Sequence, residues 1–184
     1  HLGRVLLLEA EDHLAHHASG RSAALFEPRY GLAPVVALSY ASEDHLVSAD
    51  GGVLSPRGMM MVAGPDQRAL FDREQAHFHL DEISAAEARA IVPILNPDTV
   101  GFAGVSDDAR DIDTDLLIQN FLREARANGA EVLTRARVGH ILRHTTGWTA
   151  GTAQGAFTGR ILVNAAGAWV DRIAAMAGIA PLGF

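Results

Sequence analysis

Two stretches near the start of the sequence carry side chains whose types and order suit an adenine dinucleotide. The first is the uninterrupted apolar run from Val5 to Leu8, which Glu9 closes. A short apolar run without polar alternation predicts a strand buried on both faces, as in a parallel sheet under helices. An acidic side chain at the carboxyl end of such a strand can accept hydrogen bonds from both ribose hydroxyls. The alternative is a buried strand that ends in a solvated acid.

The second stretch, from Ala18 to Ala24, supplies hydroxyl groups and one cation. Ser19 and Ser22 flank Gly20 and Arg21 in a run of otherwise small residues. Backbone N–H groups of a small-residue turn, two hydroxyls and a guanidinium can together contact a pyrophosphate. The alternatives are a helix N-cap for the serines and an ion pair with a nearby glutamate for Arg21.

The composition excludes several functional classes. The 184 residues contain 15 Lys and Arg against 22 Asp and Glu, a net charge of −7, which argues against binding to nucleic acid or a membrane surface. The chain has no cysteine, so it can hold no disulfide or thiolate metal site, and we expect a cytoplasmic location. No apolar run reaches the 18 or so residues of a membrane span, and the start lacks the layout of a signal peptide.

Periodicity and turn residues predict the elements of the first part of the chain. The first elements are a helix over 32–47 and a pair of strands over 53–63 hinged near Pro56. A helix over 66–77, capped by Asp66, follows them. The capping box of Ser84 and Glu87 then begins a helix that ends before Pro93, and the last element is a strand over 99–105.

The second part of the chain begins with the clearest helical signal. Asp111 to Asp115 opens this helix and Asn128-Gly129 stops it. Its expected buried face consists of Leu117, Phe121, Leu122 and Ala125. Further elements expected are strands over 131–134 and 138–142, an antiparallel meander over 138–157, a buried strand over 161–164 and an Ala-rich helix that ends near Gly178.

The chain contains four motifs in the order LLLEAE, HHASGRSAA, DIDTD and VNAAGAWVDRIAAMAG. Together they give the whole chain a resemblance to one family. It resembles the FAD-dependent D-amino acid oxidase/dehydrogenase (DAO-like) family, and within it the D-arginine-dehydrogenase-like branch. A Rossmann fingerprint places its Gly-rich turn about 20 residues before the ribose acid. Only eight residues precede Glu9, so we expect an internal fragment that lacks this turn and is inactive by itself.

The resemblance implies an α/β fold with FAD as the cofactor. We expect a partial Rossmann-like FAD-binding domain, with a parallel sheet and an antiparallel meander, formed by residues 1–48 and 109–184. Residues 49–108 are expected to form part of an inserted α+β substrate domain. The residues implied to contact FAD are Glu9, Ala10, Ala18, Ser19, Gly20, Arg21, Ser22, Ala23, Ala24, Val138, Ala165, Ala166 and Gly167.

The resemblance also implies three substrate contacts, at Leu25, Tyr30 and Met59. The D-arginine-specific branch has a histidine, a tyrosine and a guanidinium-binding glutamate at these positions, and only Tyr30 is retained. A cationic side chain buried against Met59 to Met61 would lose its ion partner, at a cost of several kcal/mol. We therefore expect a neutral or apolar D-amino acid as the substrate, and the alternative is that the methionines are adaptable core residues.

The reaction that the resemblance implies is oxidative deamination. A hydride passes from the α-carbon of the D-amino acid to flavin N5, and the imino acid hydrolyses to a 2-oxo acid and ammonia. The electron acceptor is oxygen or a quinone-type molecule. No catalytic residue is assigned, because the family's carboxylate-clamping groups come after the position of Phe184. Two alternatives remain: another amine or hydroxy-acid oxidase, such as a glycine or sarcosine oxidase, and a catalytically inactive, flavin-free module.

Two further clusters could bind metal ions but lack part of the required pattern. His13 and His17 are four residues apart with His16 adjacent, yet a third ligand at a fixed spacing is absent, so we expect no metal site. Asp111-x-Asp113-x-Asp115 resembles the start of a calcium loop but lacks its central Gly and closing Glu. These acids are better explained as the N-terminus of a helix, where the dipole favours them.

Overall fold

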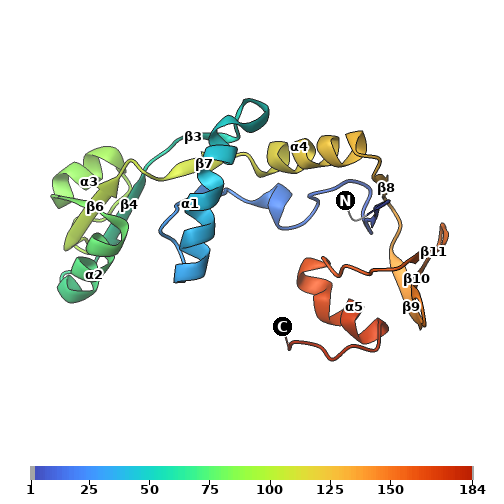
Figure 1. The fold of residues 1–184 in the computed structure, drawn as a ribbon. Helices are drawn as coiled ribbons and strands as arrows, with labels where there is room; N and C mark the ends of the chain where they lie inside the picture. The colour runs from blue at the N-terminus through green and yellow to red at the C-terminus, as the bar shows by residue number, and fades with distance from the viewer. Residues whose placement is uncertain (1–2, 184) are drawn as a thin grey trace. The chain divides into compact units, whose positions relative to one another are not determined.

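The computed structural model describes residues 3–183, and the chain divides into two compact units (Figure 1). The first unit holds the described residues up to 16 and those from 121 onward, and the second holds residues 17–120. The domain boundaries expected at 48 and 108 stay a prediction. Among the described residues, no helix combines the length and the apolar character needed to cross a membrane.

A parallel pair of strands opens the first unit. β1 (Leu6–Leu8) lies parallel to β8 (Glu131–Leu133), with Leu7 opposite Val132. The expected parallel sheet is therefore present. The expected burial on both faces is wrong, because Leu6 and Leu7 are 37% and 42% exposed. In the described part of the chain β8 is the only strand paired with β1, and two strands cannot cover their own faces.

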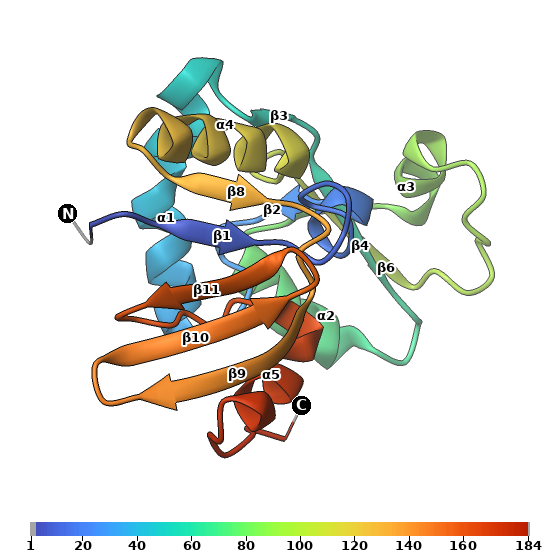
Figure 2. The same cartoon turned by 90° about the vertical axis from the view of Figure 1, so that its right-hand side faces the viewer.

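The antiparallel meander lies in the same unit and confirms the prediction for 138–157 (Figure 2). It consists of β9 (Val138–His144), β10 (Gly147–Thr152) and β11 (Gly155–Gly159), in the order β11-β10-β9. Gly151 faces His140 so closely that a Cβ at Gly151 would lie 1.9 Å from the imidazole. A side chain at this position would therefore require the exposed His140 ring to move.

The strand expected over 161–164 is wrong. Residues 161–166 pair with no strand in the described chain, and Ile161 and Val163 are 62% and 77% exposed. Without a neighbouring strand to share its backbone hydrogen bonds, an apolar run does not form a ladder. The chain then enters a 3₁₀ turn, η3 (Gly167–Trp169), and the helix α5 (Val170–Met176), which ends close to the expected Gly178.

The second unit contains a small antiparallel sheet in the order β2-β7-β3. Its strands are β2 (Leu25–Phe26), β7 (Arg110–Ile112) and β3 (Leu54–Pro56). β7 corrects the prediction that Asp111 opens a helix. The helix α4 (Thr114–Ala127) begins two residues after the strand, where the carboxylate of Asp113 accepts a hydrogen bond from the backbone N–H of Leu116 at 2.8 Å. On α4, Phe121 is 50% exposed rather than buried.

A second sheet of this unit, in the order β4-β6-β5, packs against α2 (Arg68–Phe78). Its strands are β4 (Met59–Ala63), β6 (Phe102–Ser106) and β5 (Asp81–Ile83). Phe71 of α2 is 1% exposed and stacks on Phe102, with 5.7 Å between the ring centroids. Burial of these rings supplies much of the apolar core of this sheet.

The strand pair expected over 53–63 is wrong in its pairing. Both strands exist, but β3 pairs with β7 whereas β4 pairs with β6. Pro56 lacks a backbone N–H, and Gly58 turns the chain with a φ of +80°. The chain between the two strands therefore crosses from one sheet to the next instead of forming a hairpin.

The helix expected from Asp66 begins later than predicted. α2 starts at Arg68 with Gln67 at its N-cap position. The Gln67 side-chain oxygen accepts a hydrogen bond from Gly64 N at 2.7 Å, and Gln67 N donates to Gly64 O at 3.0 Å. These two bonds close a turn over Gly64 to Gln67, and this turn excludes Asp66 from the capping role.

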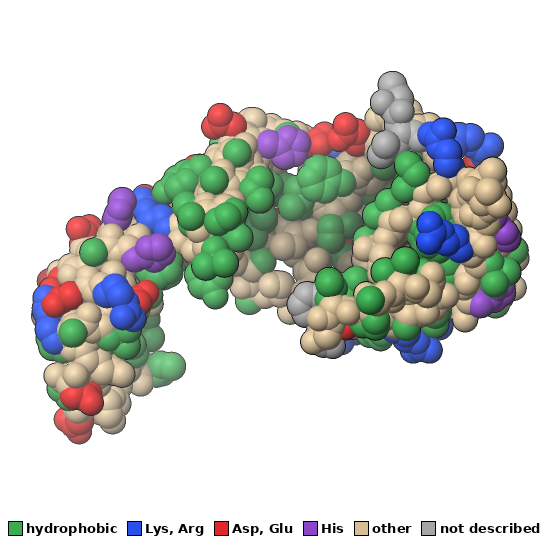
Figure 3. All heavy atoms as spheres, turned by 60° about the horizontal axis from the view of Figure 1, so that its bottom comes forward, with side chains coloured by type: hydrophobic (Ala, Val, Ile, Leu, Met, Phe, Trp, Pro, Cys, Tyr) green, Lys and Arg blue, Asp and Glu red, His purple; other side chains and the backbone are tan. Residues whose placement is uncertain are grey.

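Two helices confirm their predictions. α1 (Ala33–Ser48) is followed by a 3₁₀ turn, η2 (Ala49–Gly51). Only Leu46 of α1 is buried, and Leu38 is 67% exposed, so hydrophobic side chains gather over this helix in Figure 3. α3 (Ala85–Ile91) begins with the predicted capping box, in which Ser84 and Glu87 bond to each other's backbone N–H groups.

We expect the replacement Ser84→Ala to lower the free energy of unfolding by about 1 kcal/mol at neutral pH, because an N-cap acceptor is lost. Hydrogen bonds from the Ser84 hydroxyl and then from the Ser84 backbone N–H lower the pKa of Glu87 below its ordinary 4.5. The stabilisation from these bonds is therefore present above pH 4.5 and is lost as the pH falls through the lowered pKa.

Urea unfolding of both proteins across this pH range measures the effect. Ser42→Ala is the control, because the Ser42 hydroxyl only donates to Leu38 O within the exposed part of α1. A difference between wild type and Ser84→Ala that stayed constant down to acid pH would contradict the capping box as its source.

Candidate functional site

The carboxylate of Glu9 is held in place at the carboxyl end of β1. Glu9 N donates to Leu133 O at 2.8 Å, and Ala136 N donates to Glu9 O at 2.7 Å, so the backbone of Glu9 continues the pairing with the chain after β8. Glu9 Oε1 accepts a hydrogen bond from Glu11 N at 2.9 Å, which fixes the orientation of the half-buried carboxylate. An ionised carboxylate has about four acceptor positions, so this group can accept further hydrogen bonds from a ligand.

The predicted residues Ala10 and Val138 belong to the same end of this strand pair. Ala10 is half-buried. Backbone hydrogen bonds hold the residues on both sides of it: the two bonds of Glu9 on one side, and the bond from Arg135 N to Glu11 O at 2.7 Å on the other. Val138 is half-buried and is the first residue of β9, two residues after the buried Ala136. The structure thus places backbone groups from two separate segments near the Glu9 carboxylate.

The small residues 165–167 form a loop that an asparagine side chain holds. Asn164 Nδ2 donates to Val170 O at 2.8 Å, and Asn164 Oδ1 accepts from Ala166 N at 3.4 Å. Gly167 has a φ of +54°, a left-handed conformation that favours glycine. Asn164 was not among the predicted site residues, although an amide directly before a run of small residues is a signal that could have identified it.

The segment 18–24 begins as a 3₁₀ turn and continues in an extended conformation. η1 (Ser19–Arg21) is exposed, and Thr114 Oγ1 donates to Ser19 O at 2.6 Å, which ties this turn to the start of α4. Ser22 has extended backbone angles, and the chain then enters β2. Thr114 is therefore a second residue, beyond those predicted, that positions this segment.

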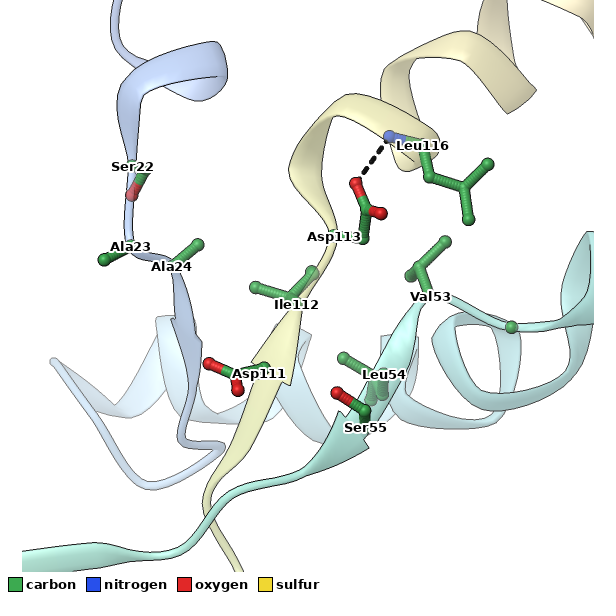
Figure 4. Close-up of a pocket in the computed structure, with 11 residues that line it drawn as sticks. Ser22, Ala23, Ala24, Val53, Leu54, Ser55, Asp111, Ile112, Asp113 and Leu116 are labelled. Atoms are coloured by element: carbon green, nitrogen blue, oxygen red, sulfur yellow. Dashed lines mark hydrogen bonds between the residues drawn. The ribbon is translucent and has the colours of Figure 1, made fainter.

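A cavity of about 500 Å³ lies beside this segment (Figure 4). Backbone bonds from Ile112 N to Ala24 O at 3.2 Å and from Asp113 N to Val53 O at 2.9 Å hold its walls together. The residues that line it are Ser22, Ala23, Ala24, Gly52, Val53, Leu54, Ser55, Asp111, Ile112, Asp113 and Leu116. The volume is within the range of small-molecule pockets.

Only one wall of the cavity was predicted, the wall formed by Ser22 to Ala24. The residues of β3 and β7 were missed, even though the DIDTD motif was recognised, because its acids were assigned to a helix. Two of its carboxylates already have partners: Asp111 pairs with Arg57 at 2.7 Å, and Asp113 caps α4. The cavity is therefore lined by small and apolar groups, by the Ser22 and Ser55 hydroxyls, and by these two carboxylates with their existing partners.

The three predicted substrate residues lie on different elements. Leu25 begins β2, is 41% exposed and pairs with Asp111, whereas Tyr30 is 72% exposed. Met59 begins β4 and pairs with Ser106 in the other sheet. None of the three is among the residues that line the cavity, so the structure does not bring them together within it.

A partly buried ion-pair network lies beside Tyr30. The Glu27 side chain is 2% exposed, and its Oε1 lies 3.4 Å from Arg29 Nη1, while Arg29 Nη2 lies 2.8 Å from Asp108 Oδ2. Glu27 O also accepts from Tyr30 N at 3.0 Å. Among the described residues, Glu27 Oε2 and Arg29 Nε make no hydrogen bond. The charge of Glu27 therefore depends on the contact of its Oε1 with Arg29, and the charge of Arg29 on the contacts of its Nη atoms with Glu27 and Asp108.

The pKa of Arg29 reflects this balance. Burial acts to lower the pKa of the guanidinium, but the hydrogen bond to Asp108 and the negative charges nearby raise it overall. Arg29 therefore stays charged and compensates the buried carboxylate of Glu27, and this pairing fixes the turn that carries Tyr30.

The residues present fit an adenine dinucleotide. In the first unit an oriented carboxylate ends a strand of a parallel pair, and a left-handed glycine follows a run of small residues. In the second unit, Ser22 to Ala24 line a cavity with small side chains. These features are typical of dinucleotide-binding α/β proteins.

The particular family follows from comparison with known proteins. The chain belongs to the DAO family of FAD dependent oxidoreductases, whose sequence pattern matches residues 1–182. FAD is therefore the cofactor of the family to which this chain belongs.

Solved structures with the same fold support this assignment. Glycine oxidase from Geobacillus kaustophilus matches 95% of this chain and 52% of its own, with a TM-score of 0.77 and 21% identity. L-proline dehydrogenase from P. horikoshii matches 96% and 50%, with a TM-score of 0.77 and 22% identity. L-alpha-glycerophosphate oxidase from Mycoplasma pneumoniae, solved with FAD bound, matches 95% and 50%, with a TM-score of 0.76 and 17% identity. The chain spans about half the length of these structures.

We expect Arg29→Met to destabilise the protein by about 3–5 kcal/mol, because the buried charge of Glu27 would lose its partner. The double variant Glu27→Gln with Arg29→Met should recover most of this loss, since both charges are then absent. Asp108→Asn is the matched control at the exposed end of the network and should cost less than about 1 kcal/mol. Urea unfolding at neutral pH measures all three. A double variant no more stable than Arg29→Met would contradict the uncompensated charge as the cause.

Proposed function

We propose that the protein is an FAD-dependent dehydrogenase or oxidase of the D-arginine-dehydrogenase-like branch and oxidatively deaminates neutral or apolar D-amino acids. The observation that carries this proposal is the oriented Glu9 carboxylate at the end of the parallel strand pair, in a chain of the DAO family. FAD, when bound, supplies the acceptor for the hydride that leaves the substrate carbon. The described residues contribute binding and orientation, and we assign no catalytic residue among them.

The proposed contacts to the adenosine half of FAD come from three segments. The Glu9 carboxylate accepts hydrogen bonds from the ribose hydroxyls, with the oxygen that already bonds to Glu11 N fixing its direction. Ala10 lies beside the adenine, and Val138 meets it through backbone groups. Ala165, Ala166 and Gly167 allow close approach of the backbone, because none of them carries a side chain beyond Cβ.

The proposed contacts to the pyrophosphate come from the segment 18–24. Ser19, Gly20 and Arg21 form an exposed 3₁₀ turn, so their hydroxyl, backbone N–H and guanidinium groups are accessible. Ser22 lines the cavity together with Ala23 and Ala24, and we propose that these three residues continue toward the flavin. A guanidinium is well suited to this role because its N–H donors match the geometry of phosphate oxygens.

The substrate proposal depends on what Leu25 and Met59 lack. Neither side chain offers a polar partner for a guanidinium, and Met59 is one of three consecutive, half-buried methionines on β4. Contact with such a surface has no unfavourable free energy for an apolar or neutral side chain of the substrate. A cationic side chain would lose hydration there without gaining an ion partner. Tyr30, which is 72% exposed, remains available for a polar contact. The electron acceptor, either oxygen or a quinone-type molecule, and the cytoplasmic location stay predictions.

We expect Glu9→Gln to weaken FAD binding at least about tenfold, because a hydrogen bond to a charged acceptor contributes about 1.5–3 kcal/mol. Quenching of flavin fluorescence during titration of the protein measures the dissociation constant without any need for activity. Glu131→Gln is the matched control, since this glutamate lies at the amino end of β8 and contacts Arg4. Equal affinity in wild type and Glu9→Gln would overturn the ribose role. An absence of flavin binding in wild type would favour the flavin-free module.

We expect the full-length wild-type enzyme that contains this chain to have a higher kcat/KM for D-methionine and D-leucine than for D-arginine, glycine or sarcosine. Met59→Glu should reverse part of this preference by giving D-arginine an ion partner, and a buried pair of this kind changes kcat/KM by about tenfold or more. Val62→Glu serves as the control, because Val62 is 42% exposed and points to the other face of β4. Faster turnover of D-arginine than of D-methionine or D-leucine would refute the substrate class, and faster turnover of glycine or sarcosine would favour the alternative oxidase.

A further inference from the structure

Three potential metal ligands come together on the segment that follows β1. His13 Nε2 lies 3.2 Å from His16 Nδ1, and His13 Nδ1 lies 2.5 Å from Asp12 Oδ1. Ala15 has a φ of +59°, so the chain turns sharply between the two histidines and their rings approach to 4.6 Å between centroids. One ligand atom from each of Asp12, His13 and His16 lies within 4.8 Å of the others. The structure therefore places a carboxylate beside the two histidines, which their spacing in the sequence did not show.

The hydrogen bond to Asp12 determines which nitrogen of His13 can bind a metal. Asp12 Oδ1 lies 2.5 Å from His13 Nδ1, and a carboxylate oxygen is the acceptor in such a contact. His13 Nδ1 must then carry the proton, which leaves the lone pair of neutral His13 on Nε2, facing His16. A histidine that donates one ring N–H to a carboxylate and binds metal through the other nitrogen is the common arrangement in metal sites.

The spacing of the two imidazole nitrogens also suits a metal ion. Zn–N bonds of about 2.0–2.1 Å in a tetrahedral site place two nitrogen ligands roughly 3.3–3.4 Å apart. The separation of 3.2 Å between His13 Nε2 and His16 Nδ1 is close to this value. With this tautomer of His13, His16 Nδ1 donates to His13 Nε2, and a divalent cation that binds both nitrogens would displace the proton from His16 Nδ1.

We propose that His13 Nε2 and His16 Nδ1 bind a divalent transition metal, with Zn²⁺ as the ion that best suits two imidazoles, and that Asp12 supports the site by holding the His13 ring through Nδ1. Water completes the coordination, because Asp12 and His13 are exposed. Asp12 is the carboxylate of this site rather than the neighbouring Glu11, whose Oε1 lies 3.3 Å from Arg137. The site is independent of the proposed redox function, since metal binding is measured without FAD or substrate.

The test is isothermal titration calorimetry of ZnCl₂ into the purified protein, prepared without a histidine tag and treated with a chelator beforehand. We expect one equivalent of Zn²⁺ to bind to wild type. His13→Ala and His16→Ala should each weaken binding by tenfold or more, and Asp12→Asn by about tenfold, since loss of even a supporting carboxylate typically costs 10–100-fold in metal affinity.

Two histidine variants distinguish this site from other modes of binding. His144→Ala is the remote control, because its imidazole bonds to Thr149 within the β9–β10 hairpin. His17→Ala removes the histidine next to the site and should leave affinity within about twofold of wild type. No binding to wild type, or an equal loss in His17→Ala and His13→Ala, would overturn the assignment. Circular dichroism of each variant shows that a loss of affinity does not come from unfolding.

Discussion

The pairing of β1 with β8 is the interaction on which the first unit depends, because it joins segments that are far apart in the sequence. The ladder continues past the strands through the bonds from Glu9 N to Leu133 O and from Ala136 N to Glu9 O. These bonds place the only charged side chain of LLLEA at a defined end of the sheet. Without them Glu9 would be a flexible surface acid, and a flexible acid would pay the entropy of ordering each time it bound a ribose.

In the second unit β7 has the corresponding role, since it pairs with β2 on one side and with β3 on the other. Segments 22–24, 52–55 and 111–113 meet at its ends, and this meeting forms the cavity. Charge is neutralised locally around these strands. Arg57 pairs with Asp111, Arg29 with Asp108 and Glu27, and Arg110 with Glu43. The cavity wall thereby combines small and apolar side chains with two carboxylates that already have partners.

The segment between β1 and η1 combines two kinds of chemistry within a few residues. Glu9 begins it with a carboxylate oriented by Glu11 N, which we propose binds the ribose, and Asp12, His13 and His16 follow in the cluster proposed to bind a divalent cation. A metal ion bound there would restrict the conformations of this segment, because it would connect both sides of the turn at Ala15.

The sequence alone determined those features whose causes are local. The capping box of Ser84 and Glu87, the extent of α1 and the turns of the meander all depend on residues a few positions apart. Most of the candidate cofactor residues could be named for the same reason, since they lie in two short motifs.

What the tertiary structure decided were non-local pairings: β3 joined β7 rather than β4, and Asp111 became part of a strand and a cavity wall. The exposure of Phe121 and Val163, and the approach of Asp12 and His13 to His16, were likewise not predictable. Burial and side-chain contacts depend on which surfaces meet, and an apolar or acidic residue has the same local signature whether or not a partner is present.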